Sequence, residues 1–408
     1  MEKKINKEKT NGKILNFKKE KMPQDYLLLS ITIILTLFGL VMVLSASAPS
    51  ALINYNNSYY FFKREAFTAV VGVIFMIIIS RKLDVKVFQK YYRIIYVISI
   101  VILALVMIPG IGTGAKGATR WAKIGPIRFQ PSELTKIGLV FSFAGYYCDK
   151  RINFSEAGYY LGIPMVLIGI PVAILVGFQN HLSAGLIMTI VMLIITIVSR
   201  IKMFDQLKLY GVMGLIGYAI LMVLKNKSTK SFRNDRITAW LNTWEGDNPT
   251  RISYQTVQSL YALASGGILG VGLGKSKQKY LYIPEAHNDF IFAIIVEELG
   301  LVGAIAVIAL FVIFAVRGYA IAANVKDKFS KLVATGLTSI VVVQAFLNIG
   351  VVTNTMPNTG ISLPFLSYGS TSLVILLSSV GVLLAISRDA RKEEKEQKQV
   401  QEGANQWK

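Results

Sequence analysis

Long apolar runs recur along almost the whole chain and limit it to one class of fold. A helix needs about 20 predominantly apolar residues to cross a bilayer. Charged residues make up only 16% of the sequence, whereas soluble domains carry about 25%. We therefore expect an all-α integral membrane protein with about ten transmembrane helices. The expected spans are residues 26–47, 66–80, 92–109, 132–147, 157–178, 182–199, 207–224, 290–315, 332–353 and 361–387.

These spans predict a single polytopic membrane domain, residues 26–387, between two charged tails. The tail 1–25 is basic, with eight Lys among its first 22 residues, and the apolar run after it is too long for a signal peptide. The tail 388–408 alternates in charge and is either a helical extension or disordered. The largest polar loop, 225–289, connects the seventh and eighth expected helices.

The net charge of +21 carries information about topology. With the N-terminus inside, the inner segments hold nearly twice as many Lys and Arg as the outer ones, so we expect both tails to be cytoplasmic. The outer basic residues nevertheless concentrate in two loops, 110–131 and 225–289. Solvated loops and an outward-facing site for an anionic substrate both explain this. The single cysteine, Cys148, excludes an intrachain disulfide.

The segment 279–292 holds the densest group of chemically useful side chains. Glu285, His287 and Asp289 lie within five residues, where the long polar loop meets the apolar run that begins at Phe290. A carboxylate at a water–lipid boundary loses solvation, and such residues often belong to functional sites. His181 and His287 are the only two histidines of the sequence. Two distant histidines without a cysteine cluster do not predict a zinc site.

A second polar segment, residues 117–136, leads into the fourth expected span. Pro131 suits a first helical turn, and Glu133 suits the positive end of a helix. Glu133 and Lys136 share a helix face, so Lys136 either pairs only with Glu133 or also binds a phosphate together with Arg120.

Three further features allow a structural and a functional interpretation. Arg64 follows the aromatic residues Tyr59–Phe62, which resemble an interfacial belt with a snorkelling arginine. The glycine-rich stretch Gly266–Gly274 indicates close helix packing rather than a phosphate loop, because no strand precedes it and no Lys-Ser/Thr completes a P-loop pattern at the required spacing. The segment 360–372, which includes Ser367, is rich in hydroxyls and is broken by Pro and Gly, so it either lines a cavity or packs helices.

These segments together resemble the SEDS family, the ten-span polymerases RodA, FtsW and SpoVE of bacterial cell-wall synthesis. The resemblance covers about residues 25–388, and the FtsW/SpoVE branch fits better than RodA. The matching motifs, in family order, are RW (120–121), RFQPSEL (128–134), VQSLYALASGGILGVGLG (257–274), PEAHNDFIF (284–292), EELG (297–300) and LPFLSYGS (363–370).

The resemblance implies the SEDS fold and a peptidoglycan glycosyltransferase, which joins lipid II units through β-1,4 bonds and releases undecaprenyl pyrophosphate. Asp289 matches the proposed catalytic aspartate. A carboxylate there can take a proton from the acceptor hydroxyl, and fixed cations can stabilise the leaving pyrophosphate. The candidate substrate-binding residues are Arg64, Arg120, Lys136, Glu133, Lys277, Lys279, Glu285, His287 and Ser367.

The resemblance also implies partners and a location. We expect lipid II and the nascent glycan strand as ligands. As protein partners we expect a class B penicillin-binding protein transpeptidase and other division or sporulation proteins, with no nucleic acid. The expected location is the bacterial cytoplasmic membrane, with the active site on its extracytoplasmic face. No cofactor is evident, and a divalent cation such as Mg²⁺ or Mn²⁺ is left open.

Two departures from the family pattern bear on the site. Many relatives read Gln-Pro-Asp-Leu-Gly-Thr where this chain has Gln179-Asn-His-Leu-Ser-Ala, so the role of an aspartate in that loop does not carry over. Ser370 stands where glycine is usual. A flippase for lipid-linked sugars is the alternative function, and it requires a polar path across both leaflets. A non-catalytic scaffold is a third alternative, in which Asp289 would be dispensable.

Overall fold

The protein, seen in a computed structural model, is described for residues 25–115, 118–125, 127–199, 201–226, 236, 240–243 and 251–405. Most of the expected tail 1–25 and much of the first half of the loop 225–289 lie outside these residues. The helices are α1 (Tyr26–Tyr55), α2 (Tyr60–Lys82), α3 (Val87–Lys90), α4 (Tyr92–Ala104), α5 (Pro131–Cys148), α6 (Ile163–Ala173), α7 (Leu182–Val198), α8 (Met203–Asn226), α10 (Arg251–Gly266), α11 (Ile291–Asn324), α12 (Lys328–Val352) and α13 (Ser370–Asn405). A 3₁₀ turn, Leu105–Met107, extends α4, and π turns at Gly158–Gly162 and Ile174–Phe178 flank α6.

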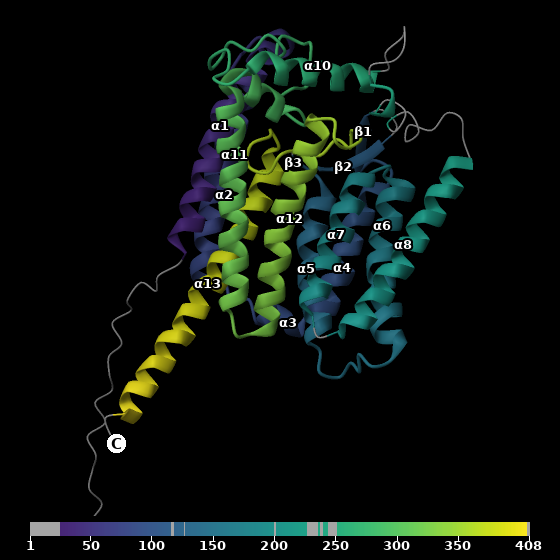
Figure 1. Ribbon diagram of the computed structural model, residues 1–408, viewed down its shortest axis with the longest axis vertical. Coiled ribbons are helices and arrows are strands. Elements are labelled where there is room, and N and C mark those ends of the chain that lie inside the picture. The colour runs from purple at the N-terminus through teal and green to yellow at the C-terminus, as the bar shows by residue number, and fades with distance from the viewer. Residues whose placement is uncertain are drawn as a thin grey trace, which may run out of the picture.

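A helix occupies each of the ten expected ranges, and most of these helices run side by side as a bundle (Figure 1). Five helical segments are long and apolar enough to cross a membrane: Tyr26–Tyr55, Gly158–Phe178, Ile291–Asn324, Lys328–Val352 and Ser370–Glu394. Many of their large apolar side chains are exposed, including Leu37, Ile305 and Val316. An apolar exterior on such helices is what lipid contact requires, so the chain is a multi-pass membrane protein.

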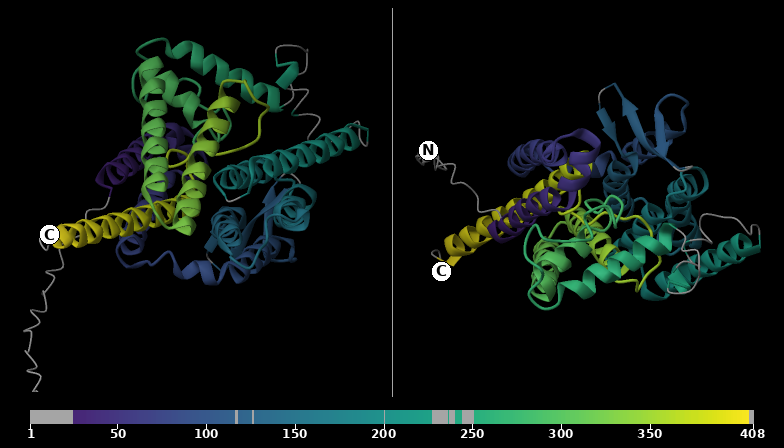
Figure 2. Two further views of the ribbon diagram at one scale, coloured as in Figure 1. Left: turned by 60° about the horizontal axis from the view of Figure 1, so that its bottom comes forward. Right: turned by 90° about the horizontal axis from the view of Figure 1, so that it is seen from above.

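One segment departs from the all-helical expectation. Residues 110–131 form a small antiparallel sheet of β1 (Gly112–Ala115), β2 (Ala118–Ile124) and β3 (Ile127–Phe129), in the order β1-β2-β3. In its register, Thr113 pairs with Trp121 and Lys123 pairs with Arg128. The sheet lies at the edge of one end of the bundle (Figure 2). It presents Arg120, on β2, beside the helix ends.

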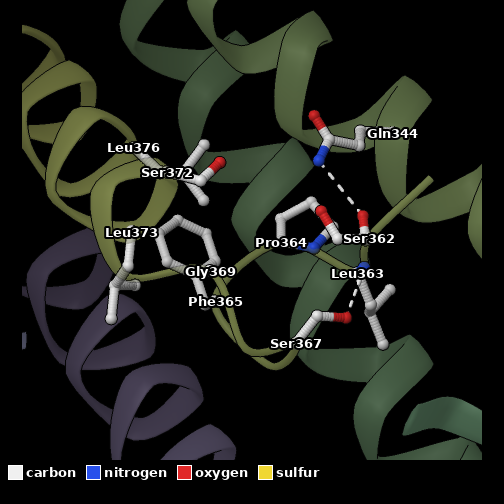
Figure 3. A pocket seen from close by; sticks show the side chains of 10 residues that line it. All are labelled: Gln344, Ser362, Leu363, Pro364, Phe365, Ser367, Gly369, Ser372, Leu373 and Leu376. Carbon is white, nitrogen blue, oxygen red and sulfur yellow. Dashed lines mark hydrogen bonds between the residues drawn. The ribbon is translucent and has the colours of Figure 1, made fainter. Parts of the chain in front are cut away.

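The last expected span begins later than predicted. Residues 361–369 are not helical, and α13 starts at Ser370 rather than at 361. Pro364 removes a backbone donor, and Gly360 and Phe365 have positive φ values of 68° and 63°. The segment instead folds back into the bundle, where Ser367 Oγ accepts a hydrogen bond of 2.7 Å from the amide of Leu363 (Figure 3). The polar first half of the predicted span is therefore an internal loop.

A similar close fit joins the glycine-rich stretch to α11. α11 is kinked at Gly300, whose φ of 68° and ψ of −165° are not helical. The opened backbone pairs with the incoming segment, through Val271 N to Glu297 O (3.0 Å) and Leu301 N to Gly267 O (2.9 Å). A Cβ on Gly300 would overlap the backbone of Ile268 and Gly270. An added Cβ on Gly266 or Gly270 would likewise overlap the α11 backbone, so these two glycines serve close packing, as the sequence indicates.

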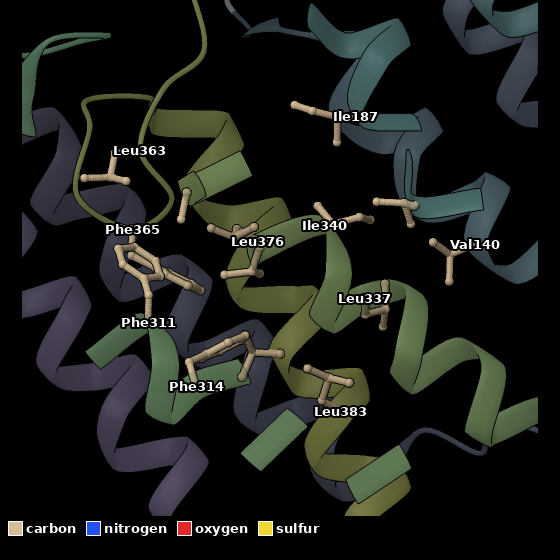
Figure 4. Packing of buried hydrophobic residues seen from close by; sticks show 14 of the residues in the cluster. Val140, Ile187, Phe311, Phe314, Leu337, Ile340, Leu363, Phe365, Leu376 and Leu383 are labelled. Carbon is tan, nitrogen blue, oxygen red and sulfur yellow. The ribbon is translucent and has the colours of Figure 1, made fainter. Parts of the chain in front are cut away.

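The core lies where α11, α12 and α13 meet α5 and α7. Phe311 and Phe314 of α11 pack near Leu376 and Leu383 of α13, and all four are buried (Figure 4). Within a bilayer, the close packing of such side chains, rather than their removal from water, holds helices together. This core keeps the N-terminal ends of α5, α7 and α11 in fixed positions.

Contacts at one end of the bundle join the start of α1 to α11, and α13 to the segment that follows α2. Asp25, before α1, forms an ion pair with Arg317 near the end of α11. Lys86 pairs with Glu393 of α13 at 2.8 Å, and Arg388 of α13 donates to the carbonyl of Leu83. The sheet, α10 and the loop that precedes α11 lie at the opposite end (Figure 1).

Candidate active site

Asp289 stands at the start of α11, at the end of the bundle that carries the sheet. It is half-buried and immediately precedes Phe290, the N-cap residue of α11. Its backbone oxygen accepts a hydrogen bond of 2.7 Å from Asn348 Nδ2 of α12. Its carboxylate lies against Gly360, where an added Cβ would be 3.4 Å from Oδ2. α12 therefore holds the backbone of Asp289, and the Gly360 backbone borders its carboxylate.

Two arginines interact electrostatically with the Asp289 carboxylate. Arg120 of β2 donates through Nη2 to the carbonyl of Asn180 at 2.6 Å, and Arg236 donates to the carbonyl of Asn358 at 3.1 Å. Burial lowers the pKa of Arg120, and the Asp289 charge opposes that shift. Burial and the nearby Arg120 lower the pKa of Arg236 to about 10, again opposed by Asp289. Both guanidinium groups remain cationic near neutral pH.

Lys136 supplies a third cation from the first turns of α5. Pro131 begins this helix, and the Lys136 ammonium lies 2.8 Å from Glu133 Oε1. The same ammonium donates to Gln344 Oε1 of α12, also at 2.8 Å. The expected Glu133–Lys136 ion pair is therefore present, and Gln344 is a partner that the sequence did not indicate.

His181 interacts electrostatically with all three cations. It is buried at the N-cap of α7. Burial, reinforced by the charges of Arg120, Lys136 and Arg236, lowers its pKa well below 6.5. The imidazole is therefore neutral among cations. Arg120 and Lys136 were expected at the site, whereas His181 and Arg236 were not.

Arg64 and Lys279 lie in other surroundings. Arg64 is exposed, donates to Tyr60 Oη at 2.8 Å and stacks over that ring. Lys279 is buried and donates to Glu298 (2.9 Å), Ser45 Oγ (3.1 Å) and the Gly274 carbonyl (2.7 Å). An ammonium has three donors, so Lys279 is fully engaged within the fold. Its expected contact with pyrophosphate is disfavoured by this geometry.

The remaining expected residues shape the loop before Asp289. The side chain of Lys277 is exposed, and its amide donates to Glu297 at 2.9 Å. Glu285 is exposed, has a φ of 54° and accepts a bond of 3.3 Å from Asn288.

His287 belongs to the same loop. It is buried 4.4 Å from the Phe61 ring and 5.7 Å from the Tyr368 ring, measured between centroids. Burial lowers its pKa to about 4. The loop is therefore fastened to α2 and to the segment that contains Ser367.

Comparison with known proteins identifies the family. A family model described as cell cycle protein, covering FtsW, RodA and SpoVE, matches residues 25–392. The chain belongs to the FtsW/RodA/SpoVE family. Stage V sporulation protein E of Bacillus subtilis (strain 168) is 38% identical over 376 residues, covering 91% of this chain and 99% of that protein. The probable peptidoglycan glycosyltransferase FtsW of Geobacter metallireducens is 38% identical over 379 residues, covering 91% and 98%.

Solved structures confirm the fold of the family. A chain described under "Structural coordination of polymerization and crosslinking by a peptidoglycan synthase complex" has a TM-score of 0.73 at 24% identity, covering 90% of this chain and 99% of that one. The rod shape determining protein RodA of Thermus thermophilus has a TM-score of 0.64 at 22% identity, covering 90% and 98%.

The two departures from the FtsW/RodA/SpoVE pattern are both accommodated. Asn180 adopts a φ of 49° and offers its carbonyl to Arg120, so the turn before α7 forms without the usual proline. Ser370 begins α13, and its hydroxyl lies 3.5 Å from Glu65 Oε2. Within the described part of the chain, His, Cys, Asp and Glu side chains form no group of three or more that could hold a metal ion. The question of a divalent cation stays open.

Proposed function

We propose that this chain is the peptidoglycan glycosyltransferase that polymerises lipid II for septal wall synthesis, in division or sporulation, and that the reaction takes place at Asp289. Relatives that match it over nine-tenths of its length are named as probable peptidoglycan glycosyltransferases or as a sporulation protein. The chain therefore shares the family's activity, and its own residues provide a site for it.

The chemistry assigns a role to each side chain. The 4-hydroxyl oxygen of the acceptor sugar attacks the anomeric carbon of the donor, and its proton passes to the Asp289 carboxylate. The bond between that carbon and the diphosphate oxygen breaks, and undecaprenyl pyrophosphate leaves with the negative charge. General base catalysis of this kind contributes about 10²–10⁴-fold. Cations aimed at the leaving group stabilise the charge that develops there.

The observation that carries the proposal is that two arginines interact with one carboxylate and share a neighbour, His181, with a buried lysine. Arg120 and Arg236 both interact with Asp289, and both surround His181 together with Lys136. In the described part of the chain, the carboxylates that interact with these cations are those of Asp289 and Glu133, so an excess positive charge remains there for an anionic ligand. A base beside an anion site is what transfer from a diphosphate requires.

The orientation in the membrane follows from charge. We infer that the end that carries Asp289 faces the cell exterior and that the end near Arg317 and Arg388 faces the cytoplasm. The basic residues of the sequence favour this orientation. The pairing of Asp25 with Arg317 and of Lys86 with Glu393 supports a common side for both tails. We further propose that the membrane is the bacterial cytoplasmic membrane.

A crosslinking partner is part of the proposal. One structural neighbour comes from a peptidoglycan synthase complex that couples polymerization and crosslinking. A glycan strand must be crosslinked to become part of the wall, so we propose a class B penicillin-binding protein transpeptidase as the partner. Lipid II and other septal proteins complete the expected set.

Reconstitution of the purified chain in liposomes tests the proposal. Fluorescent lipid II is supplied on the outer leaflet only, and both glycan length and movement of the label between leaflets are measured. Polymer without movement is the expected result. Movement of lipid II without polymer would overturn the proposal in favour of the flippase.

A further inference from the structure

α12 carries two buried amide side chains on the face that looks toward the site. Gln344 is 4% exposed and Asn348 is 0% exposed. They are four residues apart, so they lie one above the other on the helix. A buried amide is costly unless its hydrogen bonds are made. Gln344 makes them through both its oxygen and its nitrogen, and Asn348 makes two through its nitrogen, all to elements of the proposed active site.

Gln344 holds Lys136 together with Glu133. Its Oε1 accepts from Lys136 Nζ at 2.8 Å, and its Nε2 donates to the carbonyl of Ser362 at 3.1 Å (Figure 3). An ammonium only donates and a carbonyl only accepts. The amide therefore has one orientation that satisfies both partners, and it cannot flip without losing them.

Asn348 holds the backbone of Asp289 in the same way. Its Nδ2 donates to the carbonyl of Asp289 at 2.7 Å and to the carbonyl of Ile361 at 2.6 Å. Both hydrogens of the amide group are thereby committed. Ile361 and Ser362 are adjacent. One turn of α12 therefore makes hydrogen bonds to Asp289, to Lys136 and to the backbone of residues 361–362.

We propose that Gln344 and Asn348 are positioning residues that set the place of the Lys136 ammonium relative to the Asp289 carboxylate. Among the residues that the structure describes, Glu133 and Gln344 engage two of the three N–H donors of Lys136, which leaves one for a substrate oxygen. Gln344 is neutral, so it orients Lys136 without neutralising it. The inference rests on the proposed function, because it assumes that Lys136 binds the diphosphate.

The two positions should affect different steps. Gln344→Met keeps the size of the side chain but releases Lys136, so it should weaken lipid II binding about tenfold. Asn348→Leu leaves the carbonyls of Asp289 and Ile361 without donors, so it should lower kcat about tenfold with little change in lipid II binding. Gln206→Met is the matched control, because Gln206 is also buried and donates to a backbone carbonyl, that of Ile201, outside the site.

A double-mutant comparison separates positioning from a general structural role. The Kd for lipid II is measured in the Asp289→Asn background, which prevents turnover. Gln344→Met should weaken binding about tenfold there, and less than twofold when Lys136→Met is also present. Equal effects in both backgrounds would overturn the inference. If Gln344→Met does not fold, Gln344→Ala replaces it. Alanine also removes the acceptor for Lys136, so the same difference between the two backgrounds is expected.

The two proposals fail in different ways. If the wild-type chain makes no polymer, the proposed function fails, while the coupling between Gln344 and Lys136 can still be measured by binding. If the wild type makes polymer and both α12 variants match the Gln206→Met control in binding and rate, the positioning role is refuted.

Discussion

Replacing Lys136 by methionine separates the structural and catalytic parts of the site most clearly. The Lys136 side chain is 3% exposed and that of its partner Glu133 is 12% exposed, with 2.8 Å between them. Removing one member of a buried ion pair costs about 3–5 kcal/mol, because the other charge stays buried and unpaired. The partial exposure of Glu133 puts the expected loss near the lower figure.

The effect on catalysis should be of comparable size but separate in origin. A hydrogen bond from a charged group to a ligand contributes about 1.5–3 kcal/mol, which corresponds to a loss of about 10- to 150-fold in kcat/KM. The double variant Glu133→Gln/Lys136→Met removes the unpaired charge. It should regain most of the stability of the wild type and none of its activity.

Thermal unfolding in detergent and the initial rate of lipid II polymerisation measure the two effects. Lys208→Met is the matched control, because Lys208 has the same three-residue spacing to Asp205, at 3.0 Å, but is 60% exposed. It should change neither quantity appreciably. If the double variant regained activity along with stability, Lys136 would only stabilise the fold. The exchange Glu133→Lys/Lys136→Glu should not restore activity either, since it turns a carboxylate toward the Gln344 oxygen.

Three further predictions follow from individual residues. Arg236→Ala should lower kcat/KM for lipid II by more than tenfold without changing the unfolding temperature greatly, and near-normal turnover would exclude Arg236 from the site. His287 has a pKa of about 4 in the folded chain against 6.5 ordinarily. Its contribution to the free energy of unfolding, about 3 kcal/mol, should therefore be lost as the pH falls from 6.5 toward 4. His287→Phe should show a flatter pH dependence of unfolding, and an unchanged dependence would contradict this. In a Cys148→Ser background, a cysteine at Lys277 should react with an impermeant maleimide in spheroplasts and one at Asp205 should not, and the reverse pattern would invert the proposed topology.

The sequence predicted the helices well, and it drew attention to Arg120 and Lys136, for physical reasons. Apolar runs of bilayer length define helices with little ambiguity, and every expected span coincides with one. Arg120 and Lys136 attracted notice because an outward-facing or buried cation needs an explanation, and both contribute to the site around Asp289.

The remaining site residues depend on long-range packing that no local pattern encodes. Gln344 and Asn348 are polar residues four apart in an apolar helix, which was the one available signal. Arg236 lay among many basic residues of a long loop with nothing to distinguish it. Conversely, the sequence suggested Lys279 as a ligand for pyrophosphate, but in the fold its ammonium forms an ion pair with Glu298. The internal loop 361–369 was placed within the last span because hydropathy set the bounds of that span, although the Pro and Gly of the segment already marked a break in the sequence.

The central claim is that Asp289 is the base of glycan polymerisation, and single-turnover polymerisation by the Asp289→Asn variant tests it most directly. Asparagine keeps the size of the side chain but cannot take the proton, while the contacts made by the Asp289 backbone are retained. The variant should insert into the membrane, unfold at a temperature close to that of the wild type and bind lipid II, yet form no glycan. Asp205→Asn, the same change outside the site, should polymerise normally. Near-normal polymer length from a folded Asp289→Asn variant would contradict the account.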